Sequence, residues 1–131
     1  VFHNCVIVSI RKRFPGHAKK VMNAIWGLGL LSLSRCVIVV DDDVDVQNLS
    51  SVAFYAFSNV DAGRDMLVTE GPVDALDHAA PYFAYGSKVG FDATRKWQGE
   101  GLVREWPTEA VMSDEVRTRV DERWREYGID R

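Results

Sequence analysis

The sequence predicts an α/β domain whose mostly parallel sheet is flanked by helices. Two short runs of apolar, largely β-branched residues, at 6–10 and 36–40, are typical of buried strands. Between them, residues 16–30 carry apolar side chains at helical spacing. Strand, helix and strand in this order form a βαβ unit with a right-handed crossover. The 131 residues contain no linker or repeat, so we expect 1–131 to form a single domain.

The first helix is expected to begin after the strand 6–10, where Pro15 and Gly16 interrupt the apolar run. Its apolar residues recur at steps of three and four and should form one face, which consists of Ala18, Val21, Met22, Ile25 and Leu28. The second strand, 36–40, is apolar at every position, as in a parallel strand that is covered on both faces. This first unit therefore predicts a buried, parallel strand pair.

The next helix is predicted at 49–59, with Asn48 or Ser50 as its N-cap. Its expected apolar face consists of Val52, Ala53, Ala56, Phe57 and Val60. Three further segments follow: a short strand at 66–68, a Gly-, Pro- and Asp-rich loop at 71–87 with one helical turn at 74–78, and a strand at 88–93.

An amphipathic helix is predicted at the C-terminal end of the chain. Ser113 is a good N-cap, and Asp114 and Glu115 then face the positive end of the helix dipole. Gly128 ends the helix after about Tyr127. The apolar side chains form a narrow stripe of Val116, Val120, Trp124 and Tyr127. Such a stripe should pack along one line against the domain or a partner.

The composition excludes several classes of protein. A net charge of −3 and a pI near 5.6 disfavour a nucleic-acid partner. No apolar stretch is long enough for a transmembrane helix. Cys5 and Cys36 lie in apolar runs and are expected to be buried thiols in a reducing cytosol. The chain starts without Met, which suggests that the numbering begins inside a longer protein.

Clustered carboxylates follow the second strand, at Asp41, Asp42, Asp43 and Asp45. At the carboxyl end of a parallel strand, such a cluster can hold Mg²⁺ or Mn²⁺. The alternative is a solvated turn whose acids cap the following helix or pair with Arg and Lys. Because no second acidic motif completes a metal shell, we favour this alternative and expect no metal ligands here.

A basic run leaves the first strand just before the first helix. Arg11, Lys12 and Arg13 come first, and His17 lies at the helix start. Cations beside a helix N-terminus suit a phosphate or carboxylate, although the run matches no phosphate-binding loop. His17 is, on base rates, more often a local cap or surface residue.

The segment 86–94 places Lys88 between two glycines, with Asp92 following. It predicts either a close approach of the backbone to another chain or ligand, or a structural Lys–Asp pair. His3 and His78 are isolated and are expected to be structural. No nucleophile elbow, HExxH, P-loop or strand-linked GxGxxG is present, so the sequence predicts no self-sufficient active site.

Four segments, at 8–26, 36–66, 86–97 and 106–124, together resemble the C-terminal part of the UbiD family of decarboxylases, the 3-octaprenyl-4-hydroxybenzoate carboxy-lyase-like enzymes. The resemblance includes VSIRKRFPGHAKK, CVIVVDDDVDV and GSKVGFDATRKW, in the same order. It implies the C-terminal α/β domain of a larger polypeptide, which also contains an N-terminal domain and a flavin-binding barrel.

The resemblance also implies a function. The full-length enzyme would use prenylated FMN, Mn²⁺ and a monovalent cation to decarboxylate an aromatic or unsaturated acid, in ubiquinone or menaquinone biosynthesis. The family's catalytic residues lie in the earlier domains, so none is expected here, and the fragment alone should bind no cofactor and be inactive. Its expected place is cytoplasmic, or peripheral to a membrane if the substrate is a prenylated quinone precursor. The domain would form a wall or lid of the pocket and contribute to a homo-oligomer.

Four residues are candidates for the pocket side of this domain. Lys12 and then Arg11 are the first choices for facing the flavin phosphate or pocket mouth, and His17 and Lys88 are substrate-pocket or loop candidates. The competing hypothesis is a stand-alone α/β metal-dependent transferase that uses the cluster Asp41 to Asp45.

Overall fold

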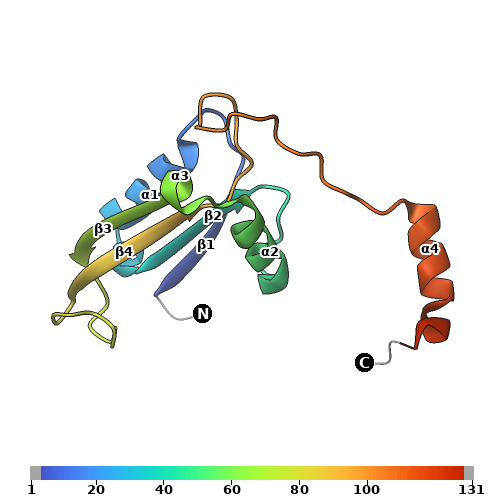
Figure 1. The fold of residues 1–131 in the computed structure, drawn as a ribbon. Coiled ribbons are helices and arrows are strands. Elements are labelled where there is room, and N and C mark those ends of the chain that lie inside the picture. Colours follow the sequence, from blue (N-terminus) through green and yellow to red (C-terminus); the bar gives the residue numbers. More distant parts are fainter. Residues whose placement is uncertain (1–3, 129–131) are drawn as a thin grey trace.

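The computed structural model describes residues 4–128, and its centre is a four-stranded sheet with the order β1-β2-β4-β3 (Figure 1). Strands β1 (Cys5–Ile10), β2 (Cys36–Asp41) and β4 (Tyr85–Asp92) are parallel, and β3 (Met66–Pro72) pairs antiparallel with β4. The predicted mostly parallel α/β fold is confirmed.

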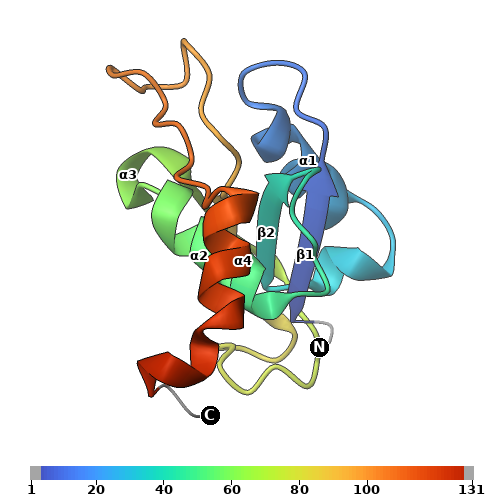
Figure 2. The same cartoon turned by 90° about the vertical axis from the view of Figure 1, so that its right-hand side faces the viewer.

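Helices cover both faces of the sheet, because the alternating side chains of β2 are apolar on both sides. Helix α1 (His17–Gly27) buries Met22 against Val37 and Val39 on one face. Helix α2 (Leu49–Asn59) buries Val52 near Val40 on the other face. Figure 2 shows the two helices on either side of β1 and β2. The prediction that β2 is covered on both faces is correct.

Helix α1 is shorter than the predicted 16–30. It ends at Gly27, and Gly29 then takes a φ of 66°, in the left-handed region that glycine enters without strain. A short 3₁₀ turn, η1 (Leu30–Leu33), follows. Leu28, which we placed on the apolar face, is 80% exposed, because the helix has already ended there.

The strands β3 and β4 form a hairpin that extends into the segment predicted as a loop. Their ladder runs from the Met66–Phe91 pair to the Pro72–Tyr85 pair. Pairing with a neighbouring strand satisfies the backbone of Gly-rich and polar residues that have little strand propensity of their own. The turn predicted at 74–78 is not helical, and the Asp74 carboxylate instead accepts a hydrogen bond from the Leu76 amide at 2.8 Å.

Helix α2 begins as predicted: the Asn48 side chain accepts a hydrogen bond from the Ser51 amide at 3.1 Å. A short helix that we did not predict, α3 (Ala62–Asp65), starts at Asp61, whose carboxylate accepts from the Gly63 and Arg64 amides. Asp61 thus acts as a second N-cap, directly before β3.

Part of the expected apolar face of α2 remains uncovered. Phe57 is 89% exposed, because α2 leaves part of this face of β2 and β4 uncovered. A shallow apolar hollow results, which we call the open sheet face and which is lined by Ile38, Ala56, Phe57, Val60, Ala62 and Phe91. The prediction that Phe57 is buried in this domain is wrong.

The C-terminal helix α4 (Asp114–Glu122) continues into the 3₁₀ turn η2 (Trp124–Tyr127) and projects from the sheet on an extended segment (Figure 1). Ser113 caps α4 as predicted, and Gly128 follows η2 with a φ of 64°. No residue of α4 is buried within residues 4–128. We expected this helix to pack on the domain or on a partner, and among the described residues the domain does not bury it.

Candidate functional site

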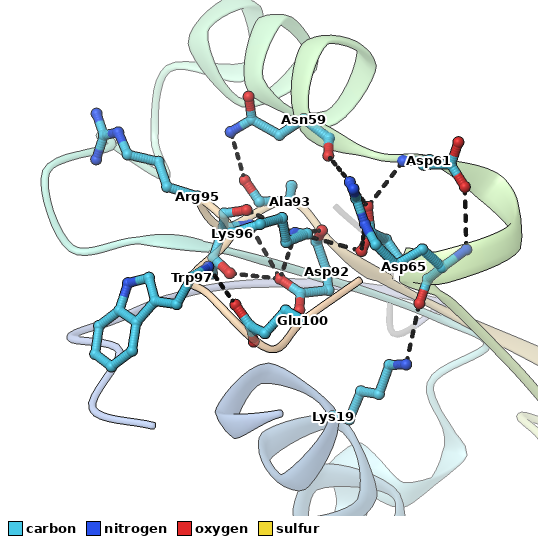
Figure 3. A network of polar contacts seen from close by, with 12 residues as sticks. Lys19, Asn59, Asp61, Asp65, Asp92, Ala93, Arg95, Lys96, Trp97 and Glu100 are labelled. Carbon is cyan, nitrogen blue, oxygen red and sulfur yellow. Dashed lines mark hydrogen bonds and ion pairs between the residues drawn. The ribbon is translucent and has the colours of Figure 1, made fainter. Parts of the chain in front are cut away.

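The carboxyl ends of β1, β2 and β4 meet at one edge of the sheet, where α/β proteins usually bind ligands. The loops that leave these strands, at 11–16, 42–48 and 93–101, contain most of the charged candidates found in the sequence. Together with α3, these loops form a buried polar network, which consists of Lys12, Arg64, Asp65, Asp92, Thr94, Lys96 and Glu100. We call this set the edge network. Figure 3 shows the part of it around Asp65, Asp92, Lys96 and Glu100.

Lys96 is at the centre of the edge network. Its side chain is 1% exposed, and its ammonium donates to the backbone oxygens of Asp92 and Thr94, both at 2.6 Å. The Asp92 and Asp65 carboxylates lie 3.1 and 3.6 Å away. Burial lowers the pKa of Lys96, and the two carboxylates oppose this shift. Lys96 therefore fixes the turn that directly follows β4.

Lys12 connects this turn to the first strand and helix. Its ammonium donates to Thr94 Oγ1 at 3.0 Å, to the Arg95 backbone oxygen at 2.8 Å and to the Glu100 carboxylate. An ammonium has three hydrogens, so these partners use all of them. The Lys12 side chain is 2% exposed and that of Glu100 is 8% exposed. This buried pair joins positions that are 88 residues apart in the chain.

Glu100 also holds the start of α1. Its carboxylate accepts from the Gly16 amide at 2.9 Å and from the Trp97 amide at 2.7 Å. Burial by itself would raise the pKa of Glu100, but the bonds from Lys12, Trp97 and Gly16 outweigh it and lower the pKa. Glu100 is therefore an ionised internal link between the loop 93–101 and the basic loop 11–16.

A second arm of the edge network leads to α3. The Asp65 carboxylate accepts from Arg64 at 2.7 and 2.9 Å and from the Asp61 amide at 2.8 Å. Burial would raise the pKa of Asp65, yet the bonds from Arg64 and the Asp61 amide lower it. From α1, Lys19 donates to the Arg64 backbone oxygen at 3.0 Å, and from α2, Asn59 donates to the Ala93 oxygen at 2.8 Å. Figure 3 shows these bonds on α3 and beside the turn after β4.

The acidic cluster after β2 is neutralised by arginines. The Arg95 guanidinium lies 2.8 Å from the Asp43 carboxylate, and the backbone amide of Arg95 donates to the Asp41 carboxylate at 2.8 Å. Arg11 Nε donates to Asp42 at 2.8 Å, and the Asp45 carboxylate accepts from the Gln47 amide. Burial raises the pKa of Asp41, whereas Arg95 lowers the pKa of Asp43.

This arrangement favours the alternative of paired and capping carboxylates. Among residues 4–128, no group of three or more His, Cys, Asp or Glu side chains could hold a metal ion. The hypothesis of a stand-alone metal-dependent transferase thus gains no support from the described cluster.

Three of the four predicted pocket residues meet at the carboxyl edge, and the fourth does not. Arg11, Lys12 and His17 lie on the loop 11–16 and the start of α1. Lys88 lies in the first half of β4, where it is 3% exposed and donates to the Ser32 backbone oxygen. Burial lowers the pKa of Lys88. The Lys–Asp pair that we considered for this segment exists, but its lysine is Lys96.

His17 and the exposed cations form the outer surface of the site. The His17 ring stacks on Phe14 with its centroid 4.4 Å away, and its buried Nδ1 has no hydrogen-bond partner. Arg11, Arg13 and Lys19 are exposed beside it, so the rim is basic although the interior is balanced. A cleft of about 440 Å³ adjoins this rim, between the start of α1 and the loop 99–101.

The sequence contained one signal for the part of the edge network that we missed. Polar residues stand at every second position from the last residue of β4 onward, at Asp92, Thr94 and Lys96. In an extended chain, this spacing places their side chains on one side. Glu100 and Asp65 carry no comparable local signal, because their partners come from other segments. Within the described residues, the edge network holds and shapes a basic loop.

The chain matches the family model described as 3-octaprenyl-4-hydroxybenzoate carboxy-lyase C-terminal domain, over residues 1–93. It is 49% identical to an uncharacterized protein of Aquifex aeolicus over 129 residues and 49% identical to one of Archaeoglobus fulgidus over 126 residues. These matches cover 98% and 95% of this chain, respectively, and 26% of each relative. The chain thus spans about a quarter of the length of the curated relatives that it matches.

Solved structures of decarboxylases share the fold. The vanillic acid decarboxylase of Sedimentibacter hydroxybenzoicus, in its open form, superposes with a TM-score of 0.75 at 29% identity, over 94% of this chain and 26% of that chain. The UbiD-class enzyme HmfF of Pelotomaculum thermopropionicum, in complex with FMN, gives a TM-score of 0.69 at 23% identity, over 87% of this chain and 24% of that chain. An evolved dimeric form of HmfF, in complex with prFMN, gives a TM-score of 0.59 at 21% identity, over 86% of this chain and 21% of that chain. At these identities, the two HmfF structures support the fold alone.

Proposed function

We propose that this chain, which belongs to the UbiD family of carboxy-lyases as its C-terminal domain, forms one wall of the pocket of a prenylated-FMN-dependent decarboxylase. The membership confirms the family that the sequence resembled. It also supports the proposal that the chain is part of a decarboxylase. The substrate in this proposal is an aromatic or unsaturated acid, and ubiquinone or menaquinone biosynthesis is the proposed pathway.

The observation that carries the proposal is the contrast between a balanced interior and a basic rim. Lys12, Lys96 and Arg64 are neutralised by Glu100, Asp92 and Asp65 inside the edge network. The network therefore holds the loop 11–16 in place and leaves its exterior cations for other molecules. A rigid basic rim beside a cleft suits an acid substrate or a phosphate that is bound mainly by another domain.

The described residues could contact prenylated FMN that is held by another domain, but they do not enclose it. All three ammonium hydrogens of Lys12 are used inside the domain, so a cofactor contact by Lys12 stays a prediction that would require these bonds to rearrange. The Arg11 side chain is 78% exposed and uses only Nε on Asp42, so its terminal nitrogens point to Arg11 as the better phosphate partner. No cradle for a whole flavin is described in residues 4–128.

The chain's own residues would then have three tasks. Arg11 binds and orients an anionic group, the edge network keeps Arg11 and His17 in position, and the loop 93–101 helps to exclude water from the cleft. When bound, prenylated FMN supplies the chemistry that cleaves the carbon–carbon bond. The proposed Mn²⁺ and monovalent cation would take their ligands from the preceding domains, because the carboxylates Asp41 to Asp43 are engaged by arginines.

The open sheet face is the proposed oligomer contact with a second copy of the chain. Phe57 and Val68 are 89% and 65% exposed on the side of the sheet that α2 leaves bare. Uncharged apolar surface of this kind is typical of permanent interfaces. Phe57→Glu should therefore dissociate the full-length oligomer in analytical ultracentrifugation, whereas Phe83→Glu, at an exposed loop residue, should leave it intact. A Phe57→Glu protein with unchanged mass would refute this contact.

An arginine substitution in the full-length polypeptide tests whether this domain forms a wall of the ligand pocket. Arg11→Ala should reduce cofactor occupancy or raise KM for the acid at least severalfold, because it removes an exposed guanidinium from the rim. Arg125→Ala, on η2, removes an equally charged exposed side chain far from the rim and serves as the control. Occupancy, KM and kcat that are unchanged in Arg11→Ala would contradict a ligand-facing role.

No helix within residues 4–128 has the length and apolar character that crossing a bilayer requires.

A further inference from the structure

Cys5 and Cys36 occupy directly paired positions at the amino ends of β1 and β2. We infer that they form a redox-active dithiol, which small-molecule disulfides such as oxidised glutathione convert reversibly into a cross-strand disulfide. The pair lies at the end of these strands that is opposite the edge network. The inference therefore concerns a second site and goes beyond the proposed wall of the decarboxylase pocket.

The strand register places the two sulfurs within reach of each other. Neighbouring strands lie about 4.8 Å apart, which falls inside the Cα–Cα range of roughly 4.4–6.8 Å found for disulfides. Ile7 and Ile38, two residues further along each strand, both pack in the cluster beneath α2. Since side chains alternate along a strand, Cys5 and Cys36 project to that same face. No change of register is needed to join them.

Both thiols are accessible enough to react. We expected buried cysteines, but Cys5 and Cys36 are half-buried and unbridged in the structure. The reason is their position at the first residue of each strand, where the cover by neighbouring elements is thinner. Partial exposure distinguishes reactive cysteines from inert core thiols.

The two thiols have unequal reactivity. A hydrogen bond from Cys36 lowers the pKa of Cys5 to about 7, whereas the same contact and burial raise the pKa of Cys36. Near neutral pH, a substantial fraction of Cys5 is therefore thiolate, to which the Cys36 thiol donates. A thiolate beside a second thiol is the arrangement of an attacking and a resolving cysteine.

The oxidation proceeds in two balanced steps. The Cys5 thiolate attacks one sulfur of oxidised glutathione, so that a mixed disulfide forms and one glutathione thiolate leaves. Cys36 then loses its proton to this leaving thiolate and attacks the Cys5 sulfur, which releases the second glutathione. Starting from the Cys5 thiolate, the pair loses two electrons and one proton, and oxidised glutathione becomes one glutathione thiol and one glutathione thiolate, which takes up a proton from water. Excess reduced glutathione reverses both steps.

Peptide mapping of the full-length polypeptide tests the pair. The protein is equilibrated with oxidised and reduced glutathione at several ratios, alkylated and digested with trypsin. We expect a disulfide between the peptide that ends at Arg11 and the peptide 36–64, whose fraction rises with the glutathione ratio and falls again with excess thiol. A folded wild-type protein that never yields this bridged peptide would overturn the inference.

Two single variants separate a redox pair from two independent thiols. Cys36→Ser lacks the resolving thiol, so Cys5 should accumulate as a stable mixed disulfide with glutathione. Cys5→Ser should leave Cys36 about tenfold slower to react than Cys5 is in the wild type, because Cys36 is mostly protonated. Circular dichroism checks that both variants are folded. Equal modification rates at the two positions in folded protein would also overturn the inference.

Discussion

Replacing Lys12 by Met would remove the ammonium that ties the loop 93–101 to β1 and α1. Met keeps most of the side-chain length, so the change mainly deletes three hydrogen bonds, to Thr94, Arg95 and Glu100. It leaves the Glu100 carboxylate in a position where its side chain is only 8% exposed. The variant therefore reports the cost of an uncompensated buried charge.

The expected loss of stability is about 3 kcal/mol. Removing one partner of a buried ion pair usually costs about 3–5 kcal/mol. The lower end applies because the Glu100 carboxylate keeps the hydrogen bonds from Gly16 and Trp97. In the double variant with Glu100→Gln the buried charge disappears, so the loss should be smaller than the sum of the two single losses by about 1–3 kcal/mol.

Urea unfolding of the chain, followed by tryptophan fluorescence, measures this loss, since Trp97 lies in the affected loop. With an m-value of about 1–3 kcal/mol/M, the midpoint should fall by about 1–3 M. Arg11→Ala is the matched control: its ion pair with Asp42 has side chains that are 78% and 46% exposed and should change stability by less than about 0.5 kcal/mol. A Lys12→Met midpoint that equals the Arg11→Ala midpoint would refute the structural role of the buried pair.

Three further substitutions probe separate parts of the fold. Because the pKa of Glu100 is lowered in the folded state, its contribution to stability is full above the unfolded pKa of about 4.3 and is lost as the pH falls through the folded pKa. In Glu100→Gln, the urea midpoint should therefore depend less on pH between pH 6 and 3 than it does in the wild type. Gly90→Ala would place a Cβ 2.5 Å from Met22 Sδ and should cost about 1–3 kcal/mol, whereas Gly27→Ala, with open space around it, should not destabilise the chain; equal thermal midpoints would contradict this contact. Asn48→Ala should lower the thermal midpoint by the equivalent of about 1 kcal/mol, since it removes the N-cap of α2, and an unchanged midpoint would argue against that cap.

Local patterns in the sequence determined most of the first half of the fold. The strands at 6–10 and 36–40 and the start of α1 were correct within about one residue, because apolar periodicity reflects which faces of a segment are buried. The N-cap Asn48 was predictable for the same reason, since it acts within one helical turn. The family could also be recognised from motifs that lie in order along the chain.

The β3–β4 hairpin and the open sheet face depended on tertiary contacts. Thr69 and Glu70 have no apolar alternation to mark them as strand, and they are extended because β4 provides their hydrogen-bond partners. Phe57 matched the predicted apolar face of α2, but its side chain is 89% exposed because it is not packed against the sheet. A helical pattern identifies a face and does not reveal how much of it another element reaches.

The sequence by itself determined that a basic run follows β1 and that an Asp-Ala-Thr-Arg-Lys segment ends β4. Only the tertiary structure decided that Lys12 pairs with Glu100, that Lys96 pairs with Asp92, and that Arg11 remains on the surface. The physical reason is that an ionised side chain in a low-dielectric interior needs an opposite charge within a few ångströms. Which charge comes that close is set by the folding of distant segments against each other, and spacing along the chain does not contain that information.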